Sequence, residues 1–146
     1  MLVCFDSSAL VKLLVDEQGS DLVVRLWDDA DALVASRLVV TEVAAALHVA
    51  HRSRRLNDRA LRLALTLWDA YPPALRIVEL SPSLARTAAE LTVPHALAGV
   101  DAVHLASVLA LDRADPVLAV WDRRLHAGAR AAGVRTVPAS LVEEPL

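Results

Sequence analysis

The chain has 146 residues, 55% of them hydrophobic, and a formal net charge of −3. This length predicts one domain over residues 1–146 with a substantial core, and no apolar run approaches the roughly 18 to 20 residues that a membrane span needs. The acidic balance excludes a broadly basic nucleic-acid-binding surface, so any such binding must use local patches. The single cysteine, Cys4, excludes an internal disulfide. With no signal peptide in the sequence, we expect a reducing, cytoplasmic setting.

The first element is expected to be a buried strand over residues 1–5, which runs directly into Asp6. A short apolar run of this kind is typical of a central strand covered on both faces. Ser7 or Ser8 can cap the helix expected over residues 8–16. Asp6 is then predicted at the carboxyl end of a buried parallel strand, where open α/β sheets bind their ligands. A carboxylate in that position needs a partner to offset its desolvation.

Helical and extended patterns alternate along the rest of the chain. Further helices are expected over residues 19–31, 36–47, 57–71, 81–94, 99–111 and 123–133. Further strands are expected over residues 32–35, 75–80, 116–121 and 134–137. This alternation predicts an α/β fold with a mostly parallel five-stranded sheet, covered by helices on both faces and connected by right-handed crossovers.

Four carboxylates are predicted at places from which they can face one crevice. Asp6 and Asp122 each follow a strand, Asp101 lies in the first turn of an apolar helix, and Glu42 projects from an apolar helix face. At roughly 4 Å and an effective dielectric near 20, each like-charged pair would repel by about 4 kcal/mol. Such a cluster either takes up protons or binds a cation. Oxygen ligands favour Mg²⁺ or Mn²⁺ over zinc, so the residues alone indicate a metal-dependent phosphodiester hydrolase.

Several histidines and arginines allow more than one interpretation. His104 follows Asp101 on nearly the same helix face, and we interpret it as a core histidine or a hydrogen-bond partner rather than a catalytic base. His48 and His51 lie one helical turn apart but lack a third metal ligand, which favours an ordinary polar surface. The five arginines of residues 52–62 fit equally well with a solvated hairpin tip and with a patch that contacts phosphates.

Four segments together resemble the ordered motifs of the PIN-domain ribonucleases, and most closely those of the VapC toxins of bacterial toxin–antitoxin modules. They are Asp6-Ser7-Ser8-Ala9-Leu10, the helix that carries Glu42, Asp101-Ala102-Val103-His104-Leu105-Ala106 and Asp122-Arg123-Arg124-Leu125. Each motif alone is weak. Their order and spacing over nearly the whole chain make the resemblance specific.

The resemblance implies a three-layer α/β/α sandwich and an endoribonuclease that uses Mg²⁺ or Mn²⁺ to activate a water against RNA. It also implies a homodimer and a cognate VapB-type antitoxin. The acidic, metal-binding site that it implies consists of Asp6, Glu42, Asp101 and Asp122. Ser8 is the polar residue beside the first aspartate. Val120 stands where the family often has Thr or Ser, which removes a hydroxyl contact beside Asp122.

Two other classes of function deserve comparison. A haloacid-dehalogenase-type phosphatase also begins with a strand that ends in aspartate, but it needs a second aspartate at the position of Ser8 and a lysine late in the chain. A catalytically weak PIN-fold module would only bind RNA or an antitoxin, and the presence of all four carboxylates argues against it. Metal-dependent cleavage of RNA separates these hypotheses.

Overall fold

The computed structural model describes residues 1–111 and 115–141. Its centre is a five-stranded sheet in the order β3-β2-β1-β4-β5, and every pairing of neighbouring strands is parallel. The strands are β1 (Leu2–Phe5), β2 (Ala32–Ser36), β3 (Arg76–Val78), β4 (Val117–Ala119) and β5 (Arg135–Val137). The predicted α/β class and five-stranded parallel sheet are therefore confirmed, and the first strand of the chain is the central one.

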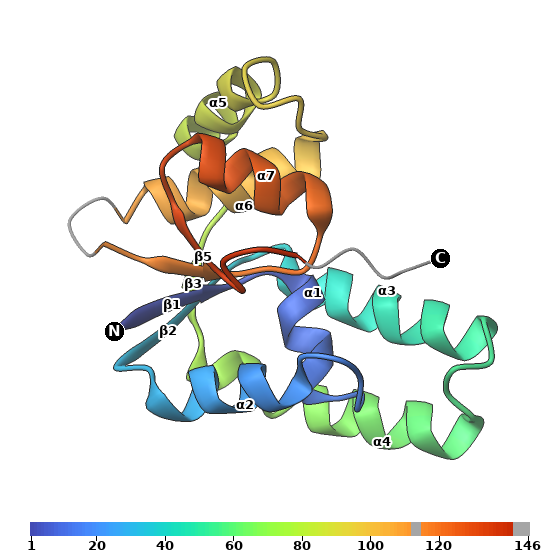
Figure 1. Cartoon of the computed structure of the whole chain (residues 1–146). Helices are drawn as coiled ribbons and strands as arrows, with labels where there is room; N and C mark the ends of the chain where they lie inside the picture. The colour runs from blue at the N-terminus through green and yellow to red at the C-terminus, as the bar shows by residue number, and fades with distance from the viewer. Residues whose placement is uncertain (112–114, 142–146) are drawn as a thin grey trace.

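Helices cover both faces of this sheet (Figure 1). The α-helices are α1 (Ser7–Leu10), α2 (Ser20–Asp29), α3 (Val39–Arg52), α4 (Asp58–Trp68), α5 (Pro82–Leu91), α6 (Gly99–Leu109) and α7 (Arg123–Ala131). Helices α5, α6 and α7 lie on one face, whereas α1, α2 and the hairpin formed by α3 and α4 lie on the other. This is the three-layer α/β/α arrangement that the family resemblance implies.

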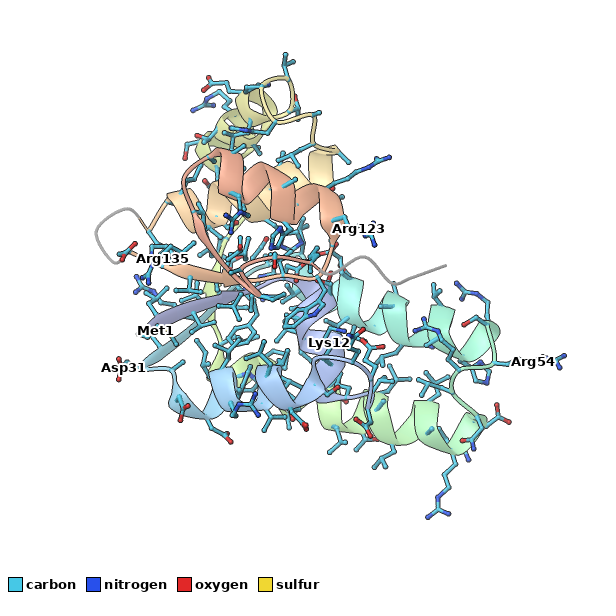
Figure 2. All side chains as sticks on the ribbon, viewed as in Figure 1. Met1, Lys12, Asp31, Arg54, Arg123 and Arg135 are labelled. Carbon is cyan, nitrogen blue, oxygen red and sulfur yellow. The ribbon has the colours of Figure 1, made fainter. Side chains whose placement is uncertain are left out.

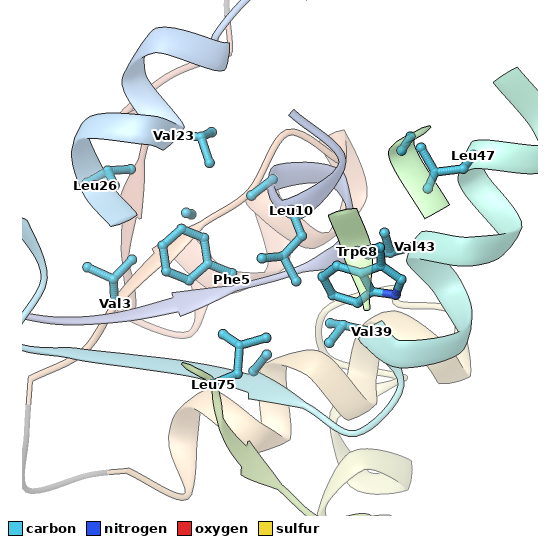
Figure 3. Close-up of a cluster of buried hydrophobic side chains, with 14 residues drawn as sticks. Val3, Phe5, Leu10, Val23, Leu26, Val39, Val43, Leu47, Trp68 and Leu75 are labelled. Atoms are coloured by element: carbon cyan, nitrogen blue, oxygen red, sulfur yellow. The ribbon is translucent and has the colours of Figure 1, made fainter. Parts of the chain in front are cut away.

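The alternation of side chains along β1 divides the core into two clusters. Val3 and Phe5 pack into the cluster beneath α1 to α4, whereas Cys4 packs into the cluster beneath α5 to α7. Figure 3 shows the first cluster, in which Phe5 lies near Val23 and Leu10. Because both faces of β1 are buried, the backbone at its carboxyl end, where Asp6 begins, is held firmly by its surroundings.

The segment after β1 differs from the predicted helix over residues 8–16. Helix α1 has only four residues and passes into a 3₁₀ helix, η1 (Val11–Leu13). Its N-cap is Asp6, whose Oδ1 accepts from the backbone N–H of Ala9 at 3.1 Å, and not Ser7 or Ser8. In the loop that follows, backbone carbonyl groups bind side chains: Ser20 Oγ donates to the Val15 carbonyl and Lys12 Nζ donates to the Gln18 carbonyl.

Other boundaries shift by a few residues. The strand predicted over 116–121 ends at Ala119, and the strand predicted over 75–80 is reduced to three residues. The helix predicted over 36–47 begins at Val39 and continues to Arg52. A second 3₁₀ helix, η2 (Pro72–Ala74), lies between α4 and β3. None of the helices in residues 1–111 and 115–141 combines the length and apolarity required to cross a bilayer.

Candidate active site

A pocket of about 400 Å³ opens at the carboxyl ends of β1 and β4. All five residues proposed from the sequence line it, namely Asp6, Ser8, Glu42, Asp101 and Asp122. They come from the loop after β1, from α1, α3 and α6, and from the loop after β4. The parallel sheet thus gathers residues separated by more than a hundred positions at one edge, as the strand-end placement predicts.

Asp6 is the most buried of the acidic residues in the pocket, with 3% of its surface exposed. Its Oδ1 accepts from Ser8 Oγ at 2.7 Å and from the Ala9 N–H at 3.1 Å. Burial disfavours the charged form and raises the pKa of Asp6 to about 6, although these hydrogen bonds and the nearby His104 act in the opposite direction. The folded protein therefore holds the ionised Asp6 side chain at a cost in free energy, and a bound cation can offset that cost.

Ser8 connects the ends of the two central strands. Its hydroxyl donates to Asp6 and accepts from the backbone N–H groups of Trp121, at 2.8 Å, and Asp122, at 3.2 Å. A serine hydroxyl has one proton and two lone pairs, so these three bonds use its whole capacity. Ser8 therefore acts on the site by fixing Asp6 relative to the backbone of Asp122.

Glu42 is held by a histidine from the neighbouring helix α6. His104 Nε2 lies 2.6 Å from Glu42 Oε1, and His104 is 4% exposed. Burial alone would lower the pKa of His104, but the bond to Glu42 and the charges of Asp6 and Asp101 outweigh it and raise that pKa. The interpretation of His104 as a buried hydrogen-bond partner is confirmed.

Asp101, on α6, and Asp122, at the start of α7, both line the pocket, and their negative charges lie close enough to interact. Burial raises the pKa of Asp101, and the negative charges of Asp122 and Glu42 raise it further. Asp122 caps α7, because its Oδ1 accepts from the Leu125 N–H at 2.9 Å. Val120 has an apolar side chain and is fully buried, so no polar side-chain atom lies at its position.

The chemistry of these side chains fits a hard divalent cation. The carboxylates of Asp6, Glu42, Asp101 and Asp122 form the acidic wall of the pocket and supply oxygen donors. The pKa values of Asp6 and Asp101 are raised in the direction that a bound cation would reverse. As they stand, the His, Cys, Asp and Glu side chains of the described residues form no group of three or more that closes on a single metal position. Convergence of the carboxylates on a metal ion remains a prediction.

The histidines and arginines left open by the sequence separate in the structure. His48 Nδ1 contacts the Ala44 carbonyl and His51 Nε2 contacts Asp58, so the two histidines have different partners. Arg55 is the arginine of the 52–62 stretch that lines the pocket. Arg52 and Arg54 line a separate hollow at the tip of the α3–α4 hairpin.

Sequence reasoning did not identify the wall formed by Lys12, Glu17 and Trp121. Lys12 Nζ donates to Glu17 Oε1 at 3.0 Å and lies 5.1 Å from the centre of the Trp121 ring. All three residues line the pocket. One feature of the sequence could have drawn attention to this part of the pocket: Lys12 is the only lysine of the chain.

Comparison with known proteins places these features in context. The family model described as PIN domain matches residues 3–129. Ribonuclease VapC49 of Mycobacterium tuberculosis is 51% identical over 140 residues, which cover 96% of this chain and 97% of that protein.

Two solved structures have the same fold at low sequence identity. The Sarcin-Ricin loop cleaving toxin VapC20 of Mycobacterium tuberculosis superposes with a TM-score of 0.63 and 21% identity, covering 90% of this chain and 95% of that one. VapBC2 of Rickettsia felis, bound to a DNA fragment from their promoter, gives a TM-score of 0.57 and 13% identity, covering 82% and 86%.

Proposed function

Because the chain belongs to the PIN-domain family and matches a VapC ribonuclease over nearly its whole length, we propose that residues 1–146 form one domain that acts as the endoribonuclease toxin of a VapBC toxin–antitoxin pair. The observation that carries this proposal is the pocket at the carboxyl ends of β1 and β4, lined by all four acidic residues of the motifs. The reaction is hydrolysis of an RNA phosphodiester bond.

We further propose that Asp6, Glu42, Asp101 and Asp122 hold Mg²⁺ or Mn²⁺. When bound, such an ion lowers the pKa of a coordinated water and neutralises charge on the reacting phosphoryl group. The protein's own residues prepare this site. Ser8 fixes Asp6 relative to the Asp122 backbone, and His104 holds one oxygen of Glu42.

The metal requirement gives a direct test of the proposed function. Purified protein is expected to cut single-stranded RNA in Mg²⁺ or Mn²⁺, to stop when EDTA is added, and to recover when the ion is returned in excess. Gel analysis of end-labelled RNA measures this. Release of phosphate from a small ester, with intact RNA, would instead indicate a phosphatase. Binding of RNA without cleavage under any ion would indicate a non-catalytic module.

We also propose a homodimer and a cognate VapB-type antitoxin as partners. Exposed apolar side chains on α2, α3 and α4 support a partner surface on this side of the molecule. They are Val24, Val49, Leu63 and Leu67. The acidic pocket suits a cationic group on the antitoxin, because charged hydrogen bonds to carboxylates are strong.

The partner proposal predicts a particular behaviour on co-expression. With the product of the neighbouring gene, the protein is expected to purify as a complex that lacks RNA cleavage, whereas alone it runs as a dimer by light scattering at micromolar concentration. A monomer that captures no product of its own operon would contradict this expectation.

A further inference from the structure

We propose that Arg55 binds an RNA phosphate adjacent to the scissile one, and that Glu17, itself fixed by Lys12, holds the Arg55 guanidinium in position for that contact. This inference rests on the proposed function, because it says how the same pocket holds its RNA. It assigns one arginine of the 52–62 stretch to the substrate and gives the fifth carboxylate of the pocket, Glu17, a positioning role.

Glu17 lies between two cations. Its Oε1 accepts from Lys12 Nζ at 3.0 Å, and its Oε2 lies 3.9 Å from the guanidinium of Arg55. Lys12 is 9% exposed and also donates to the Gln18 carbonyl at 2.8 Å. The Lys12–Glu17 pair is thus short and largely buried, and it fixes the Glu17 carboxylate at the pocket wall.

The set of Lys12, Glu17 and Arg55 carries two positive charges and one negative charge, so the charge of Arg55 is not balanced within it. Lys12 already matches the single negative charge of Glu17, and Arg55 is 58% exposed at a long ion-pair distance. Exposed pairs of this kind contribute little to stability, and one long contact with Glu17 leaves other N–H groups of the guanidinium able to bind a phosphate. A guanidinium is also the side chain best suited to two-point contact with phosphate oxygens.

The loop that carries Glu17 is itself fixed against the pocket. Gly19 has φ +91°, which favours glycine, and a Cβ placed there would lie 2.9 Å from the Trp121 ring. The same ring lies under Lys12 Nζ at 5.1 Å. Because Trp121 precedes Asp122 in the chain, the position of Glu17 is fixed relative to the acidic wall.

The neighbouring arginines are placed differently. Arg52 and Arg54 line the hollow at the hairpin tip together with His51 and Asp58. Figure 2 shows Arg54 extending from that tip away from the molecule, whereas Lys12 points inward beside α1. An RNA strand with one phosphate at the acidic wall can therefore present a neighbouring phosphate to Arg55, but not to Arg54 from the same pocket.

The test compares Arg55→Gln with Arg54→Gln, a matched loss of one positive charge from the adjacent residue outside the pocket. In steady-state cleavage of a short single-stranded RNA, Arg55→Gln is expected to raise KM about 10-fold with kcat nearly unchanged, since a uniform binding contact is lost. The salt dependence of log kcat/KM should become shallower by about 0.7, as for one lost phosphate contact. Arg54→Gln should change neither quantity, and Arg55→Lys should restore most of the salt slope.

Glu17→Gln tests the positioning role. It keeps the size of the side chain but weakens its hold on Arg55, so KM should rise less than in Arg55→Gln, and the double variant should be no worse than Arg55→Gln alone. Equal effects of Arg54→Gln and Arg55→Gln, or an unchanged salt slope in Arg55→Gln, would overturn the inference.

The same variants separate this inference from the proposed function. Binding of the RNA is measured by fluorescence anisotropy in EDTA, where no cleavage is expected. A wild-type protein that binds RNA through Arg55 but never cuts it would refute the nuclease and keep the inference. A protein that cuts RNA equally well with and without Arg55 would refute the inference and keep the proposed nuclease. A protein that does not bind RNA at all would refute the inference and the proposed nuclease together.

Discussion

Replacing Asp6 or Asp101 by asparagine is expected to reduce RNA cleavage about 10³-fold or more. Each change removes one negative charge from the wall proposed to hold the divalent ion, and loss of about 4 kcal/mol of transition-state stabilisation corresponds to that factor. The fold should survive in both variants. Asn at position 6 keeps the Oδ1 acceptor that caps α1 at Ala9, and asparagine is among the best N-cap residues.

Asp122→Asn provides the internal comparison and should lose less activity. Asp122 is exposed, its Oδ1 already caps α7 through Leu125, and the apolar Val120 adds no further oxygen at that corner. Initial cleavage rates at saturating Mg²⁺, with circular dichroism as the check of folding, give the three values. Folded Asp6→Asn and Asp101→Asn proteins that cut RNA at the wild-type rate would exclude the proposed site.

The second large effect is a gain in stability from Asp6→Asn in the absence of metal. The pKa of Asp6 is raised from 3.8 to about 6 in the folded protein, chiefly by burial. Between about pH 4 and pH 6 the folded protein therefore keeps a proton that the unfolded chain has released, and wild-type stability falls as the pH rises through this window. Above about pH 6, burial of the Asp6 charge lowers the free energy of unfolding by about 2 to 3 kcal/mol, and the asparagine variant avoids this loss.

Thermal unfolding in EDTA measures this effect. The melting temperature of Asp6→Asn should exceed that of wild type by several degrees at pH 7, and the two should converge near pH 4. Adding Mg²⁺ should then raise the melting temperature of wild type but not that of the variant. Asp122→Asn, at an exposed position, serves as the control for a generic loss of charge. A variant that is less stable than wild type at pH 7 in EDTA would show that burial of the Asp6 charge is not costly.

The acidic wall could be predicted from the sequence because each carboxylate adjoins an element with a strong apolar pattern. Asp6 follows a continuous apolar run, and Asp101 opens a helix that is apolar on nearly all sides. Once strands and helices alternate, parallel topology places strand ends at one edge of the sheet. The residues alone indicated one metal-dependent hydrolase site, and the family resemblance added RNA as the substrate of that site.

The part of the pocket formed by Lys12, Glu17 and Trp121 could not be predicted, because its contacts depend on geometry that no periodicity encodes. Lys12 meets Glu17 because the helix after β1 ends at Leu13 and the following loop brings Glu17 back to it. The contact between Trp121 and Lys12 depends on the order of the strands, and alternation of helices and strands leaves that order open. Whether the carboxylates converge on an ion depends on side-chain rotamers, which respond to the ion itself.

The bridge from Ser8 to the backbone of Trp121 and Asp122 also makes the acidic pocket one of the last parts of the chain to be completed during synthesis. The central strand β1 leaves the ribosome first, but its partner β4 and the two N–H groups that Ser8 binds are made more than a hundred residues later. A chain interrupted anywhere before residue 117 has one edge of β1 unpaired and lacks Asp122. A product that ends there therefore has an incomplete acidic pocket, and the RNA cleavage proposed for this protein requires synthesis at least as far as Asp122.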